Sequence, residues 1–471
     1  GDLMSLIIPA NTLASGGFDV ANSCRFNGSN DSLVRTPSSS GSTTINTWSF
    51  WVKRTDLNNY ETLYSSEVSA TNVFKIGFTL NTLEILFYVA PSYRFQIKTN
   101  RLFRDVSAWY NIVIIQNAGA GTSTDRLQIW VNGVRETSFA ITNFPDADEG
   151  AAPINASSVS QNIGTTGTEN FGGYMSEVVH IDGTAYAASD FGEFDEDSGI
   201  WKPIDVSGLT FGTNGSYFQF KETGTSQNSS GMGADTSGED NHYAVNNLTA
   251  IDQTTDTPTN NFCTLNALQP ISSISYSNGN LTFTNSSSNH RMVNSTLAVS
   301  SGKYYAEVKA STLGGNYPQI GIIDPDKFDN DDYLGSADGG YAYLSNGNKQ
   351  YNNSGTSFGN TYTTGDIIGI AVDLDNHKLY FAKNGTWQNS GDPTSGATGT
   401  GSAYDLVTNV SYSFAQSSID GGTDPVYDWN FGNPPYAISS GNTDGNGYGN
   451  FEYAVPSGYY SLNTKNLAEY G

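Results

Sequence analysis

Apolar and polar residues alternate with a period of two along much of the chain, most clearly between Gly365 and Gly385. The turn sequence Asp375-Asn376-His377 divides this stretch, and Asn384-Gly385 follows as a second turn. Alternation around Asn, Asp and Gly turns predicts two antiparallel strands joined as a hairpin. The apolar positions that should share one face are Ile368, Ile370, Val372, Leu374, Leu379 and Phe381.

Shorter runs of the same kind recur along the chain, separated by stretches rich in Asn, Ser, Thr and Gly. Val73–Leu80 and Leu83–Ala90 flank Asn81-Thr82, which predicts another hairpin with a two-residue turn. No long segment carries apolar residues at i, i+3, i+4 and i+7, so we expect few and short helices. The pattern predicts an all-β protein.

The composition is that of a protein with many turns and little charge. It includes 51 glycines, 13% aromatic residues and 14% charged residues. Aromatic residues suit the pleated, half-buried faces of sheets. At 471 residues the chain exceeds one ordinary hydrophobic core, so we expect two or three domains.

The net charge is strongly negative: 46 acidic residues against 21 basic residues give −25. Phosphate backbones and anionic lipid surfaces repel such a chain, so we expect no nucleic-acid partner and no membrane partner. No run approaches 18 consecutive apolar residues, so we expect no membrane insertion. The charge fits either simple solubility or cation binding at local carboxylate clusters.

The two cysteines, Cys24 and Cys263, are too few for a disulfide framework, and their separation does not match a zinc site. We expect free, partly buried thiols, with a long-range disulfide as the alternative.

Strand-like segments in the first half resemble those of laminin-G-like, concanavalin A-like lectin domains. In order they are Ser49–Lys53 (SFWVK), Trp109–Gln116 (WYNIVIIQ), Leu127–Gly133 (LQIWVNG) and Phe171–His180 (FGGYMSEVVH). The resemblance covers about residues 18–190 and implies a sandwich of two sheets. Residues 191–253 fit either further strands that complete this sandwich or a small linker module.

The second half resembles SPRY domains, which are β-sandwiches that bind ligands through loops. The resemblance rests on Gly302–Ser311 (GKYYAEVKAS), Pro318–Asp324 (PQIGIID), the Gly365–Gly385 hairpin and Trp429–Gly432 (WNFG). It implies a second sandwich in the C-terminal half of the chain.

The final segments resemble the ends of SPRY domains in tailed-bacteriophage proteins, which often pair such a domain with a concanavalin A-like domain. These segments are Trp429–Tyr436, Val455–Tyr459 and Leu462–Leu467. The resemblance implies a virion protein whose partners are other virion subunits and a glycan of the host surface. It also implies a homo-oligomer, with a trimer favoured because fibre subunits usually trimerise.

These observations predict two antiparallel β-sandwich (jelly-roll) domains in tandem, concanavalin A-like and then SPRY. The predicted boundaries are an N-terminal arm (1–20), the first sandwich (21–253), a linker (254–261) and the second sandwich (262–471). The linker is placed at 254–261 because this segment has no periodicity and is rich in turn residues.

Three aromatic residues of the second domain are candidate glycan contacts because they lie in turn-rich loops: Trp387, Tyr317 and Tyr351. A sugar ring packs its C–H face on an exposed aromatic ring, while neighbouring Asn, Asp or Gln side chains bind its hydroxyls. The alternative for each residue is ordinary packing in the fold.

Calcium is the candidate cofactor, although none is required by the pattern. Calcium binds six to eight oxygen ligands from flexible loops. One acidic group comprises Asp235, Asp240 and Asn241, and the other comprises Asp324, Asp326, Asp329 and Asp331. No EF-hand spacing is present, so an exposed acidic loop is the alternative for both groups.

No catalytic constellation is evident. Glycoside hydrolases on concanavalin-like sandwiches use alternating carboxylates on one strand face. Glu193-Phe194-Asp195-Glu196-Asp197 is the nearest segment, but its Gly-, Ser- and Asp-rich surroundings indicate a loop. No G-x-S-x-G motif and no dinucleotide or phosphate-loop motif occurs.

We therefore expect a non-enzymatic virion surface protein, a tail fibre, a spike or a capsid decoration, that adsorbs to host glycans through its loops. Two alternatives stay open: a purely structural decoration protein without a ligand, and a glycan depolymerase that uses the first sandwich.

Overall fold

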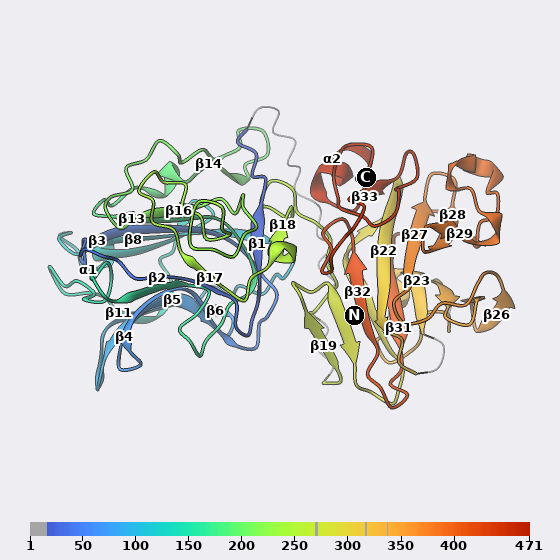
Figure 1. Ribbon diagram of the computed structural model, residues 1–471, viewed down its shortest axis with the longest axis horizontal. Coiled ribbons are helices and arrows are strands. Elements are labelled where there is room, and N and C mark those ends of the chain that lie inside the picture. The colour runs from blue at the N-terminus through green and yellow to red at the C-terminus, as the bar shows by residue number, and fades with distance from the viewer. Residues whose placement is uncertain (1–16, 269–271, 316–317, 337) are drawn as a thin grey trace. The chain divides into compact units, whose positions relative to one another are not determined.

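The computed structural model describes residues 17–268, 272–315, 318–336 and 338–471 (Figure 1). The chain forms two compact units, one ending at Asn260 and the other beginning at Asn261. Nearly all strand pairs of the described residues are antiparallel, which confirms the predicted all-β fold class. Within those residues, no helix has the length and apolar character needed to cross a membrane.

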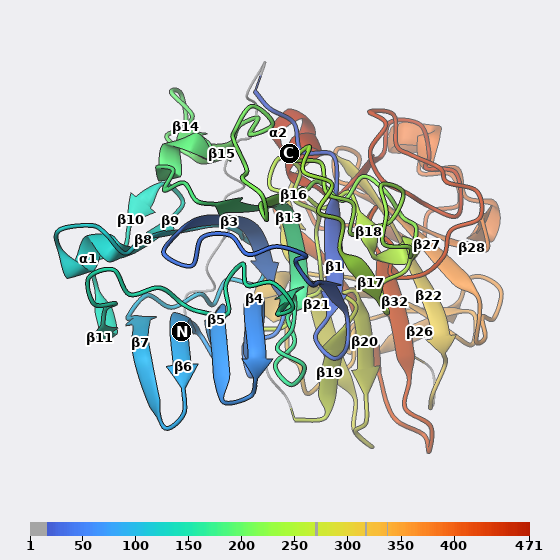
Figure 2. The same ribbon diagram turned by 60° about the vertical axis from the view of Figure 1, so that its left-hand side comes forward.

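The first unit is a sandwich of two sheets, whose layers Figure 2 shows with β4–β7 below β3 and β13. The first sheet has the order β10 (Val134–Arg135), β9 (Leu127–Val131), β8 (Trp109–Asn117), β3 (Ile45–Arg54), β13 (Gly172–Asp182), β1 (Ser23–Asn27) and β18 (Gln253–Thr254), with β16 (Ser216–Phe218) also paired to β13. The second sheet has the order β11 (Phe139–Asn143), β7 (Ser92–Thr99), β6 (Thr82–Val89), β5 (Asn72–Thr79), β4 (Tyr60–Ser69), β12 (Ser160–Ile163), β2 (Ser32–Arg35) and β17 (Ala244–Asn246).

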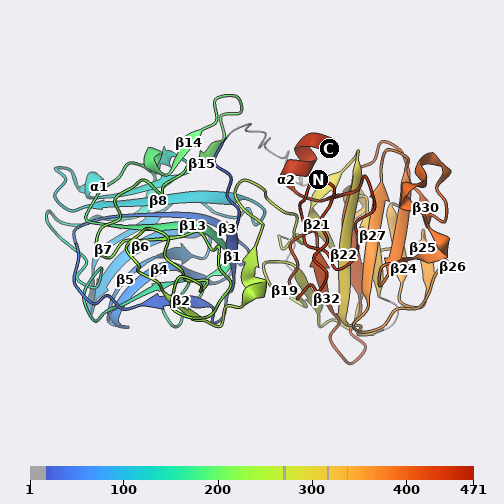
Figure 3. The same cartoon turned by 45° about the horizontal axis from the view of Figure 1, so that its top comes forward.

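The second unit is a sandwich of the same kind (Figure 3). Its larger sheet has the order β19 (Ile274–Ser277), β20 (Thr282–Asn285), β32 (Val426–Asn430), β22 (Lys303–Thr312), β27 (Ile367–Asp373), β28 (Lys378–Lys383) and β29 (Thr386–Trp387), with β30 (Tyr404–Asp405) on β28 and β33 (Tyr460–Ser461) parallel to β22. The other sheet has the order β21 (Arg291–Val299), β31 (Tyr412–Ser418), β23 (Gln319–Ile323), β24 (Gly340–Leu344), β25 (Asn348–Tyr351) and β26 (Ser354–Ser357).

Helices are few and short in the described residues, as the sequence predicts. They are α1 (Ser123–Arg126), α2 (Thr464–Tyr470) and the 3-10 turns η1 (Ala188–Asp190), η2 (Ala250–Asp252), η3 (Pro325–Lys327), η4 (Gln388–Ser390) and η5 (Pro393–Thr398). A separate two-stranded sheet pairs β14 (Gly192–Phe194) with β15 (Trp201–Pro203).

The central hairpin of the second unit is confirmed. β27 and β28 pair in register from Ile368 with Lys383 to Asp373 with Lys378, and the predicted apolar face lies in the buried core. The turn closes with His377 at φ 56° and with the Asp373 carboxylate accepting a hydrogen bond from the Asn376 backbone N–H at 2.9 Å. Alternation alone was sufficient here because both strands bury one continuous apolar face.

The hairpin of the first unit turns one residue earlier than predicted. β5 and β6 pair from Thr79 with Thr82, so the two turn residues are Leu80, at φ 55°, and Asn81. The expected turn at Asn81-Thr82 was wrong because burial of the core sets the register. Phe78 pairs with Leu83, and both side chains are buried in the core.

Residues 191–253 add strands to both sheets of the first unit. β16 pairs with β13, β17 with β2 and β18 with β1. The segment between η1 and β16 also covers the outer face of the first sheet, where Phe191, Val206 and Phe211 pack on Val179 and Ile181. Residues 191–253 thus form part of the first sandwich.

The segment 254–261, predicted to be a linker, is largely folded into the first unit. Asp256 and Thr257 are fully buried, and the Asp256 carboxylate binds the Lys53 ammonium at 2.8 Å and the Trp109 indole N–H at 3.1 Å. The local sequence of residues 254–261 does not reveal this ion pair, because Lys53 lies 203 residues before Asp256 in the sequence.

The N-terminal arm lies outside the described residues except for its last four, where the Val20 N–H donates to the Thr259 hydroxyl at 3.0 Å. Cys24 and Cys263 form no disulfide, and each is fully buried in its own unit.

Candidate ligand-binding site

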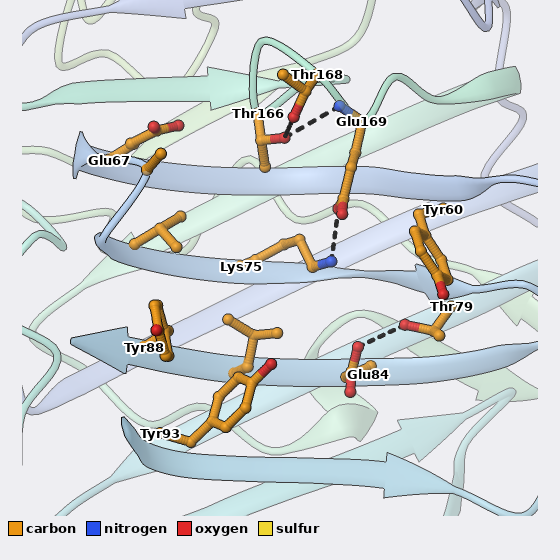
Figure 4. A pocket seen from close by; sticks show the side chains of 13 residues that line it. Tyr60, Glu67, Lys75, Thr79, Glu84, Tyr88, Tyr93, Thr166, Thr168 and Glu169 are labelled. Carbon is orange, nitrogen blue, oxygen red and sulfur yellow. Dashed lines mark hydrogen bonds and ion pairs between the residues drawn. The ribbon is translucent and has the colours of Figure 1, made fainter. Parts of the chain in front are cut away.

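A hollow of about 420 Å³ opens on the outer face of the second sheet of the first unit (Figure 4). Its floor is formed by strands β4 to β7, and the loop between β12 and β13 contributes Thr166, Thr168 and Glu169 to one wall. The hollow therefore combines side chains from parts of the chain about a hundred residues apart.

Strand alternation decides which side chains reach the hollow. In β5, Phe74, Ile76 and Phe78 point into the core, so Lys75 and Thr79 point outward. Gly77 lies between these two on the same face, and a Cβ there would come 2.1 Å from the Glu61 carbonyl oxygen. Only glycine fits, and the floor carries no side chain at this point.

An ion pair ties the loop wall to the floor. The Lys75 ammonium lies 2.6 Å from a carboxylate oxygen of Glu169. The backbone N–H of Glu169 donates to the Thr166 hydroxyl at 3.1 Å, which holds the loop in position. This pair is partly shielded from water, since the Lys75 side chain is 8% exposed.

Glu84 places a second carboxylate in the floor. It accepts hydrogen bonds from the Thr79 hydroxyl and, at 2.7 Å, from the Gln96 amide. Both donors are neutral, so the negative charge of Glu84 is hydrogen-bonded without being neutralised by them.

Tyrosine rings border the hollow at both ends. Tyr88 and Tyr93 lie together, with ring centroids 5.1 Å apart and an interplanar angle of 55°. Figure 4 shows them toward one end, with Glu67, and Tyr60 toward the other. Tyr60 is 51% exposed and Tyr93 is 46% exposed, so flat apolar surface faces the solvent beside polar groups.

This arrangement suits recognition of a polar ring compound such as a sugar. Aromatic rings can pack against C–H faces, while Glu84, Thr79 and the Lys75–Glu169 pair offer donors and acceptors for hydroxyls. In the described part of the chain, no three His, Cys, Asp or Glu side chains are grouped closely enough to hold a metal ion.

Sequence reasoning missed every residue of this hollow. Lys75 and Glu84 interrupt strongly apolar strands, but a charged residue on an alternating strand ordinarily indicates a solvated face. The contact between β5 and the Thr166–Glu169 loop depends on β12 pairing with β4, a long-range pairing that the local pattern does not reveal.

The aromatic residues predicted as glycan contacts are dispersed. Trp387 is half-buried in β29, and its ring centroid lies 6.4 Å from those of Tyr305 and Tyr380 in a small apolar cluster. Tyr351, at the end of β25, stacks on Tyr341 at 4.7 Å. Tyr317 lies outside the described residues.

The first predicted calcium group organises a loop by itself. The buried Asp235 carboxylate accepts hydrogen bonds from the backbone N–H groups of Tyr217, Ser237 and Asn241 at 2.8–2.9 Å. Asn241 uses its own side chain on Arg35 and on two backbone carbonyls, and Asp240 is almost fully exposed. The side chains of Asp235 and Asn241 are thus engaged by protein partners.

The carboxylates of the second predicted calcium group also bind separate protein partners. Asp324 accepts the Asp326 backbone N–H at the start of η3, and Asp329 accepts that of Asp331. Asp331 forms an ion pair with Arg291 at 2.7 Å. The group behaves as a set of turn-forming and ion-paired side chains.

The acidic segment Glu193–Asp197, considered as a source of catalytic carboxylates, lies in the exposed β14–β15 hairpin. Lys202 lies 3.3 Å from the carboxylates of both Glu193 and Asp195. Hydrogen bonds from Ser198, followed by Lys202, lower the pKa of Asp195 to about 2. An Asp of this kind is unsuited to act as a general acid.

Comparison with known proteins gives two family matches. Residues 27–186 match the model of the concanavalin A-like lectin/glucanases superfamily. Residues 303–408 match the model of the SPRY domain. The hollow lies within the first match.

Solved structures with SPRY domains are similar to about a third of the chain. The SPRY domain of human HERC1 is 14% identical, with 35% of this chain and 92% of that chain covered and a TM-score of 0.27. A human SPRY domain is 15% identical, with 37% and 99% covered and a TM-score of 0.26. Stonustoxin is 18% identical over 36% of this chain and 27% of the toxin chain, with a TM-score of 0.27.

The two family matches follow each other in the order that the sequence predicts. The chain thus contains a concanavalin A-like domain, matched over residues 27–186, followed by a SPRY domain, matched over residues 303–408.

Proposed function

We propose that the concanavalin A-like domain binds a glycan in the hollow over β4–β7. The observation that carries the proposal is the combination of exposed tyrosine rings with the fixed polar groups of Glu84, Lys75 and Glu169 in one hollow of about 420 Å³. This volume accommodates a small number of sugar rings, since ligand pockets commonly measure 300–1,000 Å³.

The setting we propose is the surface of a tailed-phage virion, where the chain serves as a tail fibre, spike or capsid decoration and adsorbs to a host-surface glycan. Support comes from the resemblance of the final segments, Trp429–Tyr436, Val455–Tyr459 and Leu462–Leu467, to phage SPRY domains. In this setting the partners are other virion subunits, and the chain is a homo-oligomer, with a trimer favoured.

We further propose that the chain binds without cleaving its ligand. Two of the three carboxylates in the hollow are already engaged, Glu169 by Lys75 and Glu84 by Thr79 and Gln96. A glycosidase needs one carboxyl group free to donate a proton and another placed opposite it.

A glycan array probed with the purified full chain tests the proposal. Tyr88→Ala and Tyr93→Ala should each raise the Kd for a bound glycan about tenfold, equivalent to about 1.4 kcal/mol, because an aromatic packing surface is lost. Phe194→Ala is the control, since Phe194 is 50% exposed, close to the 46% of Tyr93, but lies on the β14–β15 hairpin.

Two additional arms separate the alternatives. Release of reducing ends during incubation would establish a depolymerase, and absence of binding to any glycan or host cell by the folded chain would favour a purely structural decoration. Repeating the array with a chelator tests calcium: loss of binding would support an ion at Asp235 or Asp324, and unchanged binding would dismiss it.

A further inference from the structure

We propose that the hollow selects glycans carrying a free, positively charged amino group over glycans of the same backbone that are acetylated or acidic. This inference rests on the proposed function and specifies its ligand class. It is argued from the charges that line the hollow.

The lining carries three carboxylates, those of Glu67, Glu84 and Glu169, against the single ammonium of Lys75. The charge of Lys75 is balanced by its ion pair with Glu169. The carboxyl groups of Glu67 and Glu84 therefore set the charge that a ligand meets. The hydrogen-bond donors to Glu84, the Thr79 hydroxyl and the Gln96 amide, are neutral and bring no positive charge. A ligand therefore enters a site of excess negative charge.

Glu67 is the group most open to a ligand cation. Its side chain makes no hydrogen bond or ion pair with any described residue. Partial burial raises the pKa of Glu67, so a cation placed beside this carboxylate would stabilise its ionised form. The faces of Tyr88 and Tyr93 line the same hollow, and aromatic faces attract cations as well.

Two further basic residues, Arg94 and Lys98, lie on β7, and neither is among the residues that line the hollow. Arg94 follows Tyr93 but is directed to Glu149, with a nitrogen–oxygen distance of 3.9 Å. Lys98 pairs with Glu84 across the β6–β7 ladder and shares its face, but it is not among the residues that line the hollow. Sulfated or uronate-bearing glycans would thus meet uncompensated carboxylates.

The test uses matched pairs of oligosaccharides that share one backbone and carry at C2 either a free amine or an acetamide, together with a uronate oligosaccharide. Kd values are measured with the full chain at low and at high salt. We expect the free amine to bind at least fivefold more tightly than the acetamide at low salt, and the uronate to bind most weakly. The preference should shrink at high salt, because screening weakens exposed charge pairs.

Glu67→Gln should remove most of the amine preference, so that the ratio of the acetamide Kd to the amine Kd falls toward one. Glu239→Gln is the control, since Glu239 is an exposed carboxylate on the loop after Asp235 and does not line the hollow. This pair of variants separates a local effect of Glu67 from the overall negative charge of the chain.

Each result decides the matter. Equal binding of amine and acetamide, or a preference for the uronate, would overturn the charge selection and leave glycan binding intact. Binding of oligolysine with no binding of any oligosaccharide would overturn it in favour of a basic peptide ligand, and binding of none of these probes would overturn the proposed function as well.

Discussion

Buried carboxylates couple the stability of this protein to pH, and Glu177 is the clearest case. It lies in β13 at an irregularity of the β13–β3 ladder, with φ 46°, and its buried side chain accepts a hydrogen bond from the Tyr217 hydroxyl. Burial is the main cause that raises the pKa of Glu177 to about 7. The folded protein therefore holds a proton that the unfolded chain releases near pH 4.5.

Glu177→Gln should flatten part of the pH dependence of stability. Because the folded-state pKa lies above the unfolded value, stability falls as pH rises from about 4.5 to about 7, by up to roughly 3 kcal/mol from this group. The glutamine variant keeps a partner for Tyr217 but does not titrate. Chemical denaturation should show matching midpoints for variant and wild type at pH 4.5 and a higher midpoint for the variant at pH 8; parallel pH profiles would contradict this.

At the scale of elements, one carboxylate fastens the segment 432–459 onto the SPRY domain. Glu307 is fully buried in β22 and accepts hydrogen bonds from the backbone N–H groups of Glu452 and Tyr453 at 2.9 and 2.8 Å. The segment brings Phe451 and Tyr459 onto Tyr305 at the outer face of the sheet. Without Glu307, the segment would lose two of the hydrogen bonds that hold it on the sheet.

Glu307→Ala should therefore loosen this segment more than it disturbs the sandwich. Two backbone donors lose their acceptor, and the expected loss is about 2–3 kcal/mol. Hydrogen exchange should accelerate at residues 450–455. Glu452→Ala, which removes a side chain that accepts hydrogen bonds from Ser439 near the surface, is the control and should leave exchange at those amides nearly unchanged. Equal exchange in both variants would dismiss the anchoring role.

At the scale of the whole molecule, the first domain is larger than the family match. The match ends at residue 186, whereas the compact unit continues to Asn260. The additional residues supply β16, β17 and β18 and cover Val113, Ile115, Val179 and Ile181 on the outer face of the first sheet. That face is apolar because it is an interior surface in the complete domain.

A fragment ending at residue 186 should consequently fail to fold as a soluble monomer. It would expose the apolar outer face and lose the sheet strands β16, β17 and β18, whereas a fragment comprising residues 14–260 keeps these strands and the residues that cover the face. Light scattering and circular dichroism of the two fragments check this. A monomeric, cooperatively folded 14–186 fragment would show that the additional residues are dispensable.

The strands were predictable from sequence wherever one face is buried along a whole strand. The β27–β28 hairpin follows directly from alternating apolar residues, and the turn of the first hairpin was displaced by only one residue, to Leu80.

The ligand-binding residues were less predictable than the strands. Trp387 and Tyr351 were chosen for their turn-rich surroundings, but both pack against neighbouring rings. The hollow needs residues of β5, β6 and a loop a hundred positions later.

The sequence by itself determined the all-β class and the β27–β28 hairpin, because period-two burial is a local property of the chain. The order of the two sandwiches followed from the resemblance of sequence motifs to two families. Only the tertiary structure decided which outward-facing residues meet. Lys75 joins Glu169, and Lys53 joins Asp256, across separations of 94 and 203 residues. Such contacts depend on which strands become neighbours in a sheet, and local alternation does not encode that order.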